Sequence, residues 1–76
     1  MNTIPSPDES REMLKWLNRN RRMLLDSYKN QYVAYTTNRA IAHSENLREV
    51  LQLAEALGEP FAIYLVPRNV ASIQIL

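Results

Sequence analysis

Cysteine is absent from this 76-residue chain, and glycine and histidine each occur once. The lack of cysteine excludes disulfides and thiolate zinc sites, and one histidine is too few for the usual transition-metal sites, so we expect no metal and no cofactor. No apolar run approaches the ~18 residues that a membrane-spanning helix requires. The N-terminus also lacks the basic start and apolar stretch of a secretion signal, so we expect a cytoplasmic protein that does not bind membranes.

The small size and balanced charge of the chain limit what it can do alone. We expect residues 1–76 to form one domain, with residues 1–5 flexible. A core of this size rarely supplies more than about 3–5 kcal/mol of net stability. No disulfide can add to it, so we expect a homodimer. Nine basic and eight acidic side chains leave a net charge of +1, which provides no overall attraction to nucleic acids.

A first helix is predicted over residues 7–28. Ser6 is a suitable N-cap, Pro7 suits the first helical position, and Glu9 stands where a capping box requires it. Polar Asn20 interrupts the apolar stripe of this helix, so either the stripe bends around a neighbour or Asn20 has a buried hydrogen-bond partner. The stripe consists of residues spaced by three and four positions, namely Met13, Leu14, Leu17, Leu24, Leu25 and Tyr28.

A second helix is predicted to open at Ser44, whose side chain would accept a hydrogen bond from the main chain of Asn46 or Leu47. Gly58 should end this helix in the left-handed conformation, and Pro60 prevents its continuation. The apolar side of the helix is formed by Leu47, Val50, Leu51, Ala54 and Leu57.

Four segments have the composition of strands. They are residues 31–36, 39–42, 61–66 and 70–76. The first two are joined by a reversal at residues 37–39 and predict a hairpin. Apolar side chains alternate onto both faces of the first strand, so both faces should be covered. The unbroken apolar run of the third strand favours a central position. The last segment could complete its own sheet or join that of a partner.

Together these elements predict an α+β fold in the order α-β-β-α-β-β, with a small mixed or antiparallel sheet. The crossover through the second helix should be right-handed and place the third strand beside the first. We expect both helices to pack on one face of the sheet, which leaves the other face for a second subunit. The candidate dimer interface comprises Tyr32, Tyr35, Tyr64, Ile73 and Ile75.

No set of residues has the spacing of a catalytic site. His43 precedes Ser44, but adjacent side chains at a strand-to-helix junction diverge and a third orienting group is missing, so we expect His43 to have a role at the junction and predict no enzyme. An alternative function is a small nucleic-acid-binding regulator that uses the basic face of the first helix. Its contact residues would be Arg11, Lys15, Arg19 and Arg22. Acidic residues flank this stripe, and such stripes are usually solvated.

Several short motifs between about Ser10 and Pro67 occur in a recognisable combination. They are Leu14-Lys15-Trp16-Leu17 with Asn20, Tyr32-Val33-Ala34, Ile41-Ala42-His43-Ser44, Pro60-Phe61 and Val66-Pro67. In this combination the chain resembles a small prokaryotic family, domain of unknown function 5678, although it lacks the glycine often found in the hairpin turn of that family. The resemblance implies an accessory or antitoxin-like role beside a retropepsin-like aspartyl protease or a toxin-like neighbour. We therefore expect a non-enzymatic, dimeric protein-interaction module.

Overall fold

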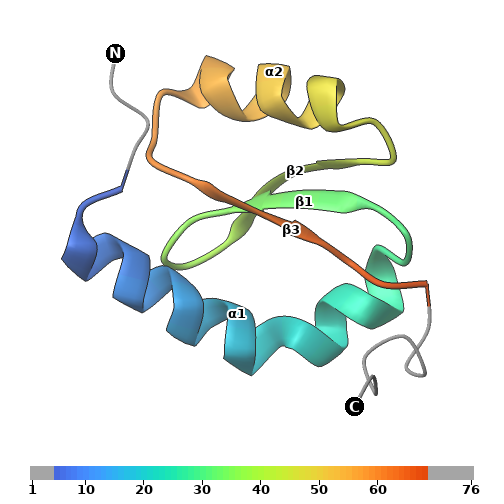
Figure 1. Cartoon of the computed structure of the whole chain (residues 1–76), viewed down its shortest axis with the longest axis horizontal. Helices are drawn as coiled ribbons and strands as arrows, with labels where there is room; N and C mark the ends of the chain where they lie inside the picture. Colours follow the sequence, from blue (N-terminus) through green and yellow to red (C-terminus); the bar gives the residue numbers. More distant parts are fainter. Residues whose placement is uncertain (1–4, 69–76) are drawn as a thin grey trace.

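The computed structural model describes residues 5–68, which form two helices and a three-stranded antiparallel sheet (Figure 1). In chain order the elements are α1 (Pro7–Ser27), β1 (Tyr32–Tyr35), β2 (Ala40–Ser44), α2 (Leu47–Leu57) and β3 (Ala62–Leu65). The α+β class and the order of these five elements are confirmed. The sixth predicted element, the strand at 70–76, lies outside the described residues, as do the first four residues of the chain.

The start of α1 agrees with the sequence. The Ser6 hydroxyl oxygen accepts a hydrogen bond from the Glu9 main-chain N–H at 3.2 Å, and the Glu9 carboxylate accepts one from the Ser6 N–H at 2.9 Å. Further along, Asn20 Nδ2 donates to the carbonyl oxygen of Trp16 at 2.9 Å. The interruption of the apolar stripe is thus satisfied by a partly buried hydrogen bond within the helix itself.

The second helix begins later than predicted. Its N-cap is Asn46, whose side-chain oxygen accepts from the Arg48 N–H at 2.9 Å. The Ser44 side chain does accept the expected hydrogen bond from the Asn46 N–H, at 3.0 Å. However, Ser44 is the last residue of β2, where it pairs with Tyr32. The prediction that the helix opens at Ser44 is therefore wrong. The predicted stop is confirmed, because Gly58 caps the helix in the left-handed conformation with φ of 73°.

The sheet has the order β2-β1-β3, with β1 antiparallel to both neighbours. The predicted placement of β3 beside β1 is confirmed, whereas the prediction of β3 as a central strand is wrong for the described sheet, since β1 is central. Pairing of β1 with β3 is regular from Tyr32↔Leu65 to Tyr35↔Ala62. Pairing with β2 shifts by one residue between Ala34 and Tyr35, so Ile41 is an extra residue that forms a β-bulge.

The two helices lie on opposite faces of the sheet (Figure 1). Val33 and Tyr35 of β1 point to the α1 side, where they pack with Trp16 and other residues of α1. Ala34 points the other way and packs with Val50 of α2. The expectation that both helices share one face is wrong, because alternation along β1 gives each face its own apolar side chains. Within residues 5–68, each face of the sheet therefore has one helix packed against it.

The hairpin turn between β1 and β2 needs no glycine. The Thr36 N–H donates to the Arg39 carbonyl oxygen at 2.8 Å. The Thr36 hydroxyl accepts from the Asn38 N–H at 3.3 Å and donates to the Asn38 side-chain oxygen at 3.1 Å. None of these residues has a positive φ, so side-chain hydrogen bonds fix the reversal that a glycine would otherwise permit.

Candidate functional site

The three predicted interface tyrosines that the structure describes do not form one surface. Tyr35 is only 6% exposed and stacks on Trp16 with ring centroids 5.6 Å apart. Tyr64 lies on the same face of the sheet, partly buried, with the Arg21 guanidinium 6.0 Å from its ring centroid. Tyr32 packs on the opposite face against the α2 cluster. Tyr35 is therefore part of the core of the single chain, and Tyr64 and Tyr32 are partly buried against that core.

Burial also changes the chemistry of Tyr35. Removal of its phenol from water raises the pKa of Tyr35 above the ordinary value of 10.0. The nearby Arg21 cation opposes this effect, and Tyr64 adds to it. The neutral phenol is thus the favoured form, as expected of a core residue. The other two predicted interface residues, Ile73 and Ile75, lie outside the described residues.

The four basic residues considered for nucleic-acid contact all lie on the exposed side of α1, but three of them have an acidic neighbour. Their exposed ion pairs are Arg11–Asp8 at 3.7 Å, Lys15–Glu12 at 3.4 Å and Arg22–Asp26 at 3.9 Å. Arg19 is also exposed. Carboxylates at this spacing reduce the positive potential of the stripe, so α1 presents a mixed charge pattern to solvent.

His43 and Ser44 do not act on each other in this fold. They are consecutive residues of β2, so their side chains leave opposite faces of the sheet. The His43 ring lies 4.4 Å from the Tyr28 ring, and its Nδ1 is 2.8 Å from Gln31 Oε1. Ser44 instead donates its hydroxyl hydrogen to Glu49. Each of the two side chains therefore has its own partner on a different face of the sheet.

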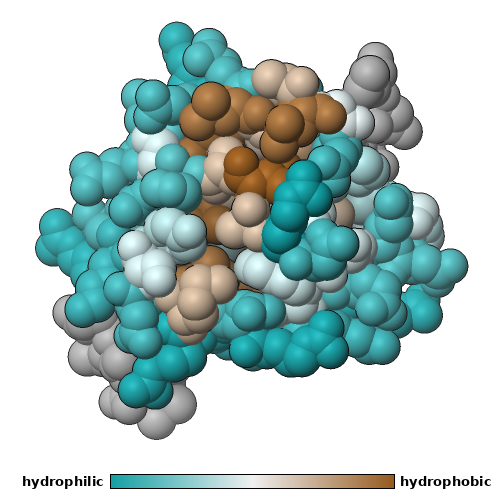
Figure 2. Space-filling model, turned by 180° about the vertical axis from the view of Figure 1, so that it is seen from behind, coloured by the Kyte–Doolittle hydropathy of each residue, from teal (hydrophilic) through white to brown (hydrophobic). Residues whose placement is uncertain are grey.

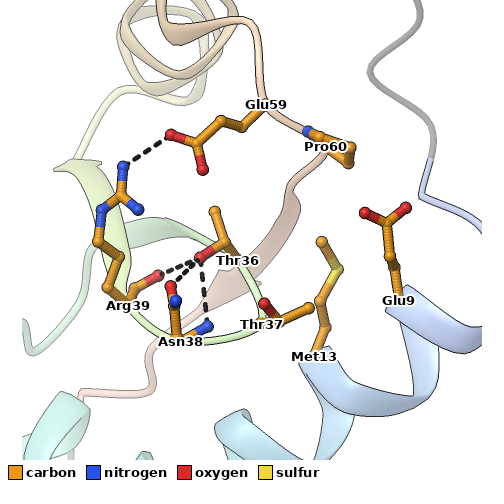
Figure 3. A pocket seen from close by; sticks show the side chains of 8 residues that line it. All are labelled: Glu9, Met13, Thr36, Thr37, Asn38, Arg39, Glu59 and Pro60. Carbon is orange, nitrogen blue, oxygen red and sulfur yellow. Dashed lines mark hydrogen bonds and ion pairs between the residues drawn. The ribbon is translucent and has the colours of Figure 1, made fainter.

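A small polar hollow lies where the hairpin turn meets the start of α1 and the loop after α2 (Figure 3). Its volume is about 130 Å³. Arg39 closes one side through a 2.7 Å ion pair with Glu59, and the Thr36 hydroxyl is used by the turn itself. Its polar groups therefore bond mainly to each other. Within residues 5–68, no three His, Asp or Glu residues are grouped closely enough to hold a metal ion, and neither helix is long and apolar enough to cross a membrane.

The most distinctive exposed feature is apolar. Leu53 and Leu57 of α2 are each 50% exposed and lie one helical turn apart. Each stands three positions after a residue that is fully buried against the sheet, Val50 or Ala54, so both leucines leave the helix on the same side of its buried line. Figure 2, seen from the side of β2, shows apolar side chains gathered over α2 and the β2 edge inside a hydrophilic border. We call Leu53, Leu57 and the exposed Ala56 between them the α2 leucine surface.

Sequence reasoning missed this surface. The predicted apolar side of the second helix included Leu57 but not Leu53, because Leu53 falls outside the stripe that faces the core. The sequence did contain an indication of this surface, because α2 carries more leucines than one buried stripe requires. A leucine beside a complete stripe marks surface that the single chain does not cover.

A family model with the description "Family of unknown function (DUF5678)" matches residues 23–69. The chain belongs to this family. The match covers the end of α1, the whole sheet and α2, but not the first part of α1, so the motif around Trp16 lies outside it. No curated protein and no solved structure matches the chain.

Proposed function

We propose that this member of the DUF5678 family is a non-enzymatic, cytoplasmic protein-interaction module that acts as a homodimer. The observation that carries the proposal is the α2 leucine surface, where two half-exposed leucines flank a small residue. An exposed apolar patch with a polar border is typical of a protein interface.

A second copy of the chain is the partner that fits this surface best. In a two-fold dimer the same patch meets itself, so it must be self-complementary. Leu53 and Leu57 are uncharged, and Ala56 allows two helices to approach closely. An antiparallel pair of α2 helices would therefore bury the leucines of both copies without burying a charge. It would also add to the small core of the single chain, which has no disulfide to stabilise it.

The faces outside the dimer contact would bind the second partner. Family resemblance suggests an accessory or antitoxin-like role, with a retropepsin-like protease or a toxin-like neighbour as that partner. The alternative function, nucleic-acid binding through α1, is less favoured because acidic residues accompany three of the four basic side chains of the stripe.

Two matched substitutions test the dimer. Leu53→Lys places a charge in the α2 leucine surface, whereas Gln52→Lys introduces the same side chain at the adjacent exposed position outside it. By sedimentation at micromolar concentration, the unchanged chain and Gln52→Lys should be dimers, and Leu53→Lys a monomer. Circular dichroism should show the same helix content for all three, because Leu53 is not a buried residue of the core.

Two results would contradict the proposal. The first is a stably folded monomer for the unchanged chain at this concentration. The second is a Leu53→Lys variant that dimerises as strongly as Gln52→Lys, which would show that the contact lies elsewhere.

A further inference from the structure

The α2 leucine surface lies on the side of α2 that faces the edge strand β2. The hydroxyl of Ser44, the last residue of β2, donates a hydrogen bond to the Glu49 carboxylate. Leu53 and Leu57 follow Glu49 by four and eight residues, and side chains at this spacing form one row along a helix. Both leucines therefore lie on the β2 side of α2, where Figure 2 shows the apolar patch.

The bulge of β2 affects how a partner can approach this row. Ile41, the extra residue of the bulge, is partly buried against the cluster that contains Val50 and Ala54. It therefore lies on the same side of the sheet as α2. A bulge interrupts the regular ladder and disfavours the addition of a further strand at this edge. A partner that covers the row is therefore expected to contact it through side chains.

The two ends of the row carry groups of opposite charge. The exposed Glu49 carboxylate lies at one end, beside Ser44. At the other end Glu59 follows Leu57 by two residues, and its carboxylate lies 2.7 Å from Nη2 of Arg39, the residue that precedes β2. The Arg39 side chain is 51% exposed. A guanidinium has five N–H donors, so Arg39 can bind a second carboxylate beside that of Glu59.

We propose that two copies of the chain pair across a two-fold axis between Leu53 and Leu57, so that Glu49 of each copy contacts Arg39 of the partner subunit. The inference rests on the proposed homodimer through the α2 leucine surface. It adds the relative orientation of the two copies and the charged residues that select it.

The spacing along α2 fits this orientation. At 1.5 Å per residue, Leu53 lies roughly 6 Å and Leu57 roughly 12 Å from Glu49 along the helix axis. A two-fold axis midway between the leucines places each Leu53 opposite the partner's Leu57. It also places Glu49 opposite a point roughly 6 Å beyond the partner's Leu57, in the region where Glu59 holds Arg39. A parallel arrangement would instead bring the Glu49 carboxylates of both copies together, and like charges disfavour such a contact.

The two ion pairs between the copies would lie at the rim of the contact, where water reaches them. Exposed ion pairs contribute little to affinity. Charges at the rim of an interface nevertheless favour one orientation, because a wrong orientation brings like charges together. The expected signature is therefore a selective choice of partner rather than a large gain in affinity.

Two charge reversals test the orientation. Glu49→Arg would bring cations together in its own dimer, and Arg39→Glu would bring carboxylates together, so each variant alone should dimerise at least about tenfold more weakly than the unchanged chain. A mixed dimer of the two variants restores both pairs of opposite charge, because a two-fold contact is reciprocal. Native mass spectrometry of an equimolar mixture should find more than about nine tenths of the dimers mixed, whereas random pairing gives about half.

The matched control reverses charges on the other side of α2. Glu55→Arg and Arg48→Glu make the same two changes at exposed positions outside the row. Each should dimerise as the unchanged chain does, and their mixture should pair at random. Circular dichroism should give the same helix content for all four variants, because all four positions are exposed.

The outcomes separate the orientation from the homodimer itself. A preference for mixed dimers of Glu49→Arg with Arg39→Glu, absent from the control mixture, supports the proposal. Random pairing of these two variants, when the unchanged chain is a dimer, would overturn the orientation and leave the homodimer in place. An equal preference in the control mixture would also overturn it, since general charge attraction would then explain the pairing. A monomeric unchanged chain would overturn both proposals.

Discussion

Tyr35 shows how a single side chain can make the stability of this protein depend on pH. Burial raises its pKa in the folded state, so the folded chain keeps the phenolic proton at a pH where the unfolded chain releases it. Stability is therefore fully present below the unfolded pKa of about 10 and falls as the pH rises above it. Tyr35→Phe should lose less stability than the unchanged chain between about pH 9 and pH 11.

Urea denaturation at these two pH values measures the effect. Tyr28, Tyr32 and Tyr64 remain in both proteins, so the difference in slope reports the ionisation of Tyr35 together with its interaction with Tyr64. Identical slopes would show that burial beside Trp16 does not raise the pKa of Tyr35.

Gly58 is a residue whose backbone conformation decides the end of a helix. Its φ of 73° is accessible to glycine without steric cost. Gly58→Val should reduce the free energy of unfolding by about 1–2 kcal/mol, because a Cβ clashes in the left-handed region. Gly58→Asn should have a smaller effect, since asparagine tolerates this region. Thermal denaturation measures both, and an unchanged melting temperature for Gly58→Val would be inconsistent with the observed backbone.

At the level of the elements, the β1–β2 hairpin depends on the Thr36 hydroxyl. Thr36 is 4% exposed, and its hydroxyl accepts a hydrogen bond from the Asn38 N–H and donates one to the Asn38 side-chain oxygen. Thr36→Val keeps the shape but removes these hydrogen bonds, so it should cost about 1 kcal/mol of stability. Thr37→Val, one position further into the turn, is the control and should be nearly neutral. Equal unfolding free energies for the two variants would show that the Thr36 hydroxyl does not stabilise the turn.

The boundaries of elements followed from the sequence where one local signal acts alone. Ser6, Pro7 and Glu9 determine the start of α1, and Gly58 the end of α2. The start of α2 could not be predicted in the same way, because Ser44 and Asn46 are both suitable caps. The choice between them is made by the pairing of Ser44 with Tyr32 in the sheet, which is a tertiary contact.

The arrangement of the elements was only partly predictable. Alternation in β1 correctly indicated two covered faces, but it could not decide whether a helix or a second subunit covers the second face. The apolar run of β3 indicated burial on both sides but carries no information on how many strands pair with it. The burial of Tyr35 could not be predicted for a related reason. A large aromatic side chain fills a core as readily as an interface, and Tyr35 is buried because it packs on Trp16.

For the whole molecule, the response to salt separates the two candidate functions. A dimer held by Leu53 and Leu57 buries no charge, so its dissociation constant should change little between about 0.05 M and 0.2 M salt. Binding of DNA through α1 would weaken steeply over the same range, because each neutralised phosphate releases a counterion. Sedimentation and retention on a DNA column measure the two responses. Tight, strongly salt-dependent retention on DNA would favour the alternative function.

The central position of β1 also determines when this protein can finish folding during its synthesis. β1 ends at Tyr35, whereas β3 begins at Ala62, so at about 5–20 residues per second the ribosome needs roughly 1–5 s to supply the second neighbour of the central strand. Until then β1 has one unpaired edge next to Val33 and Ala34. A chain that stops before residue 62 lacks the strand that covers this edge, so such a truncated chain should aggregate or be degraded, whereas a chain that includes β3 should fold.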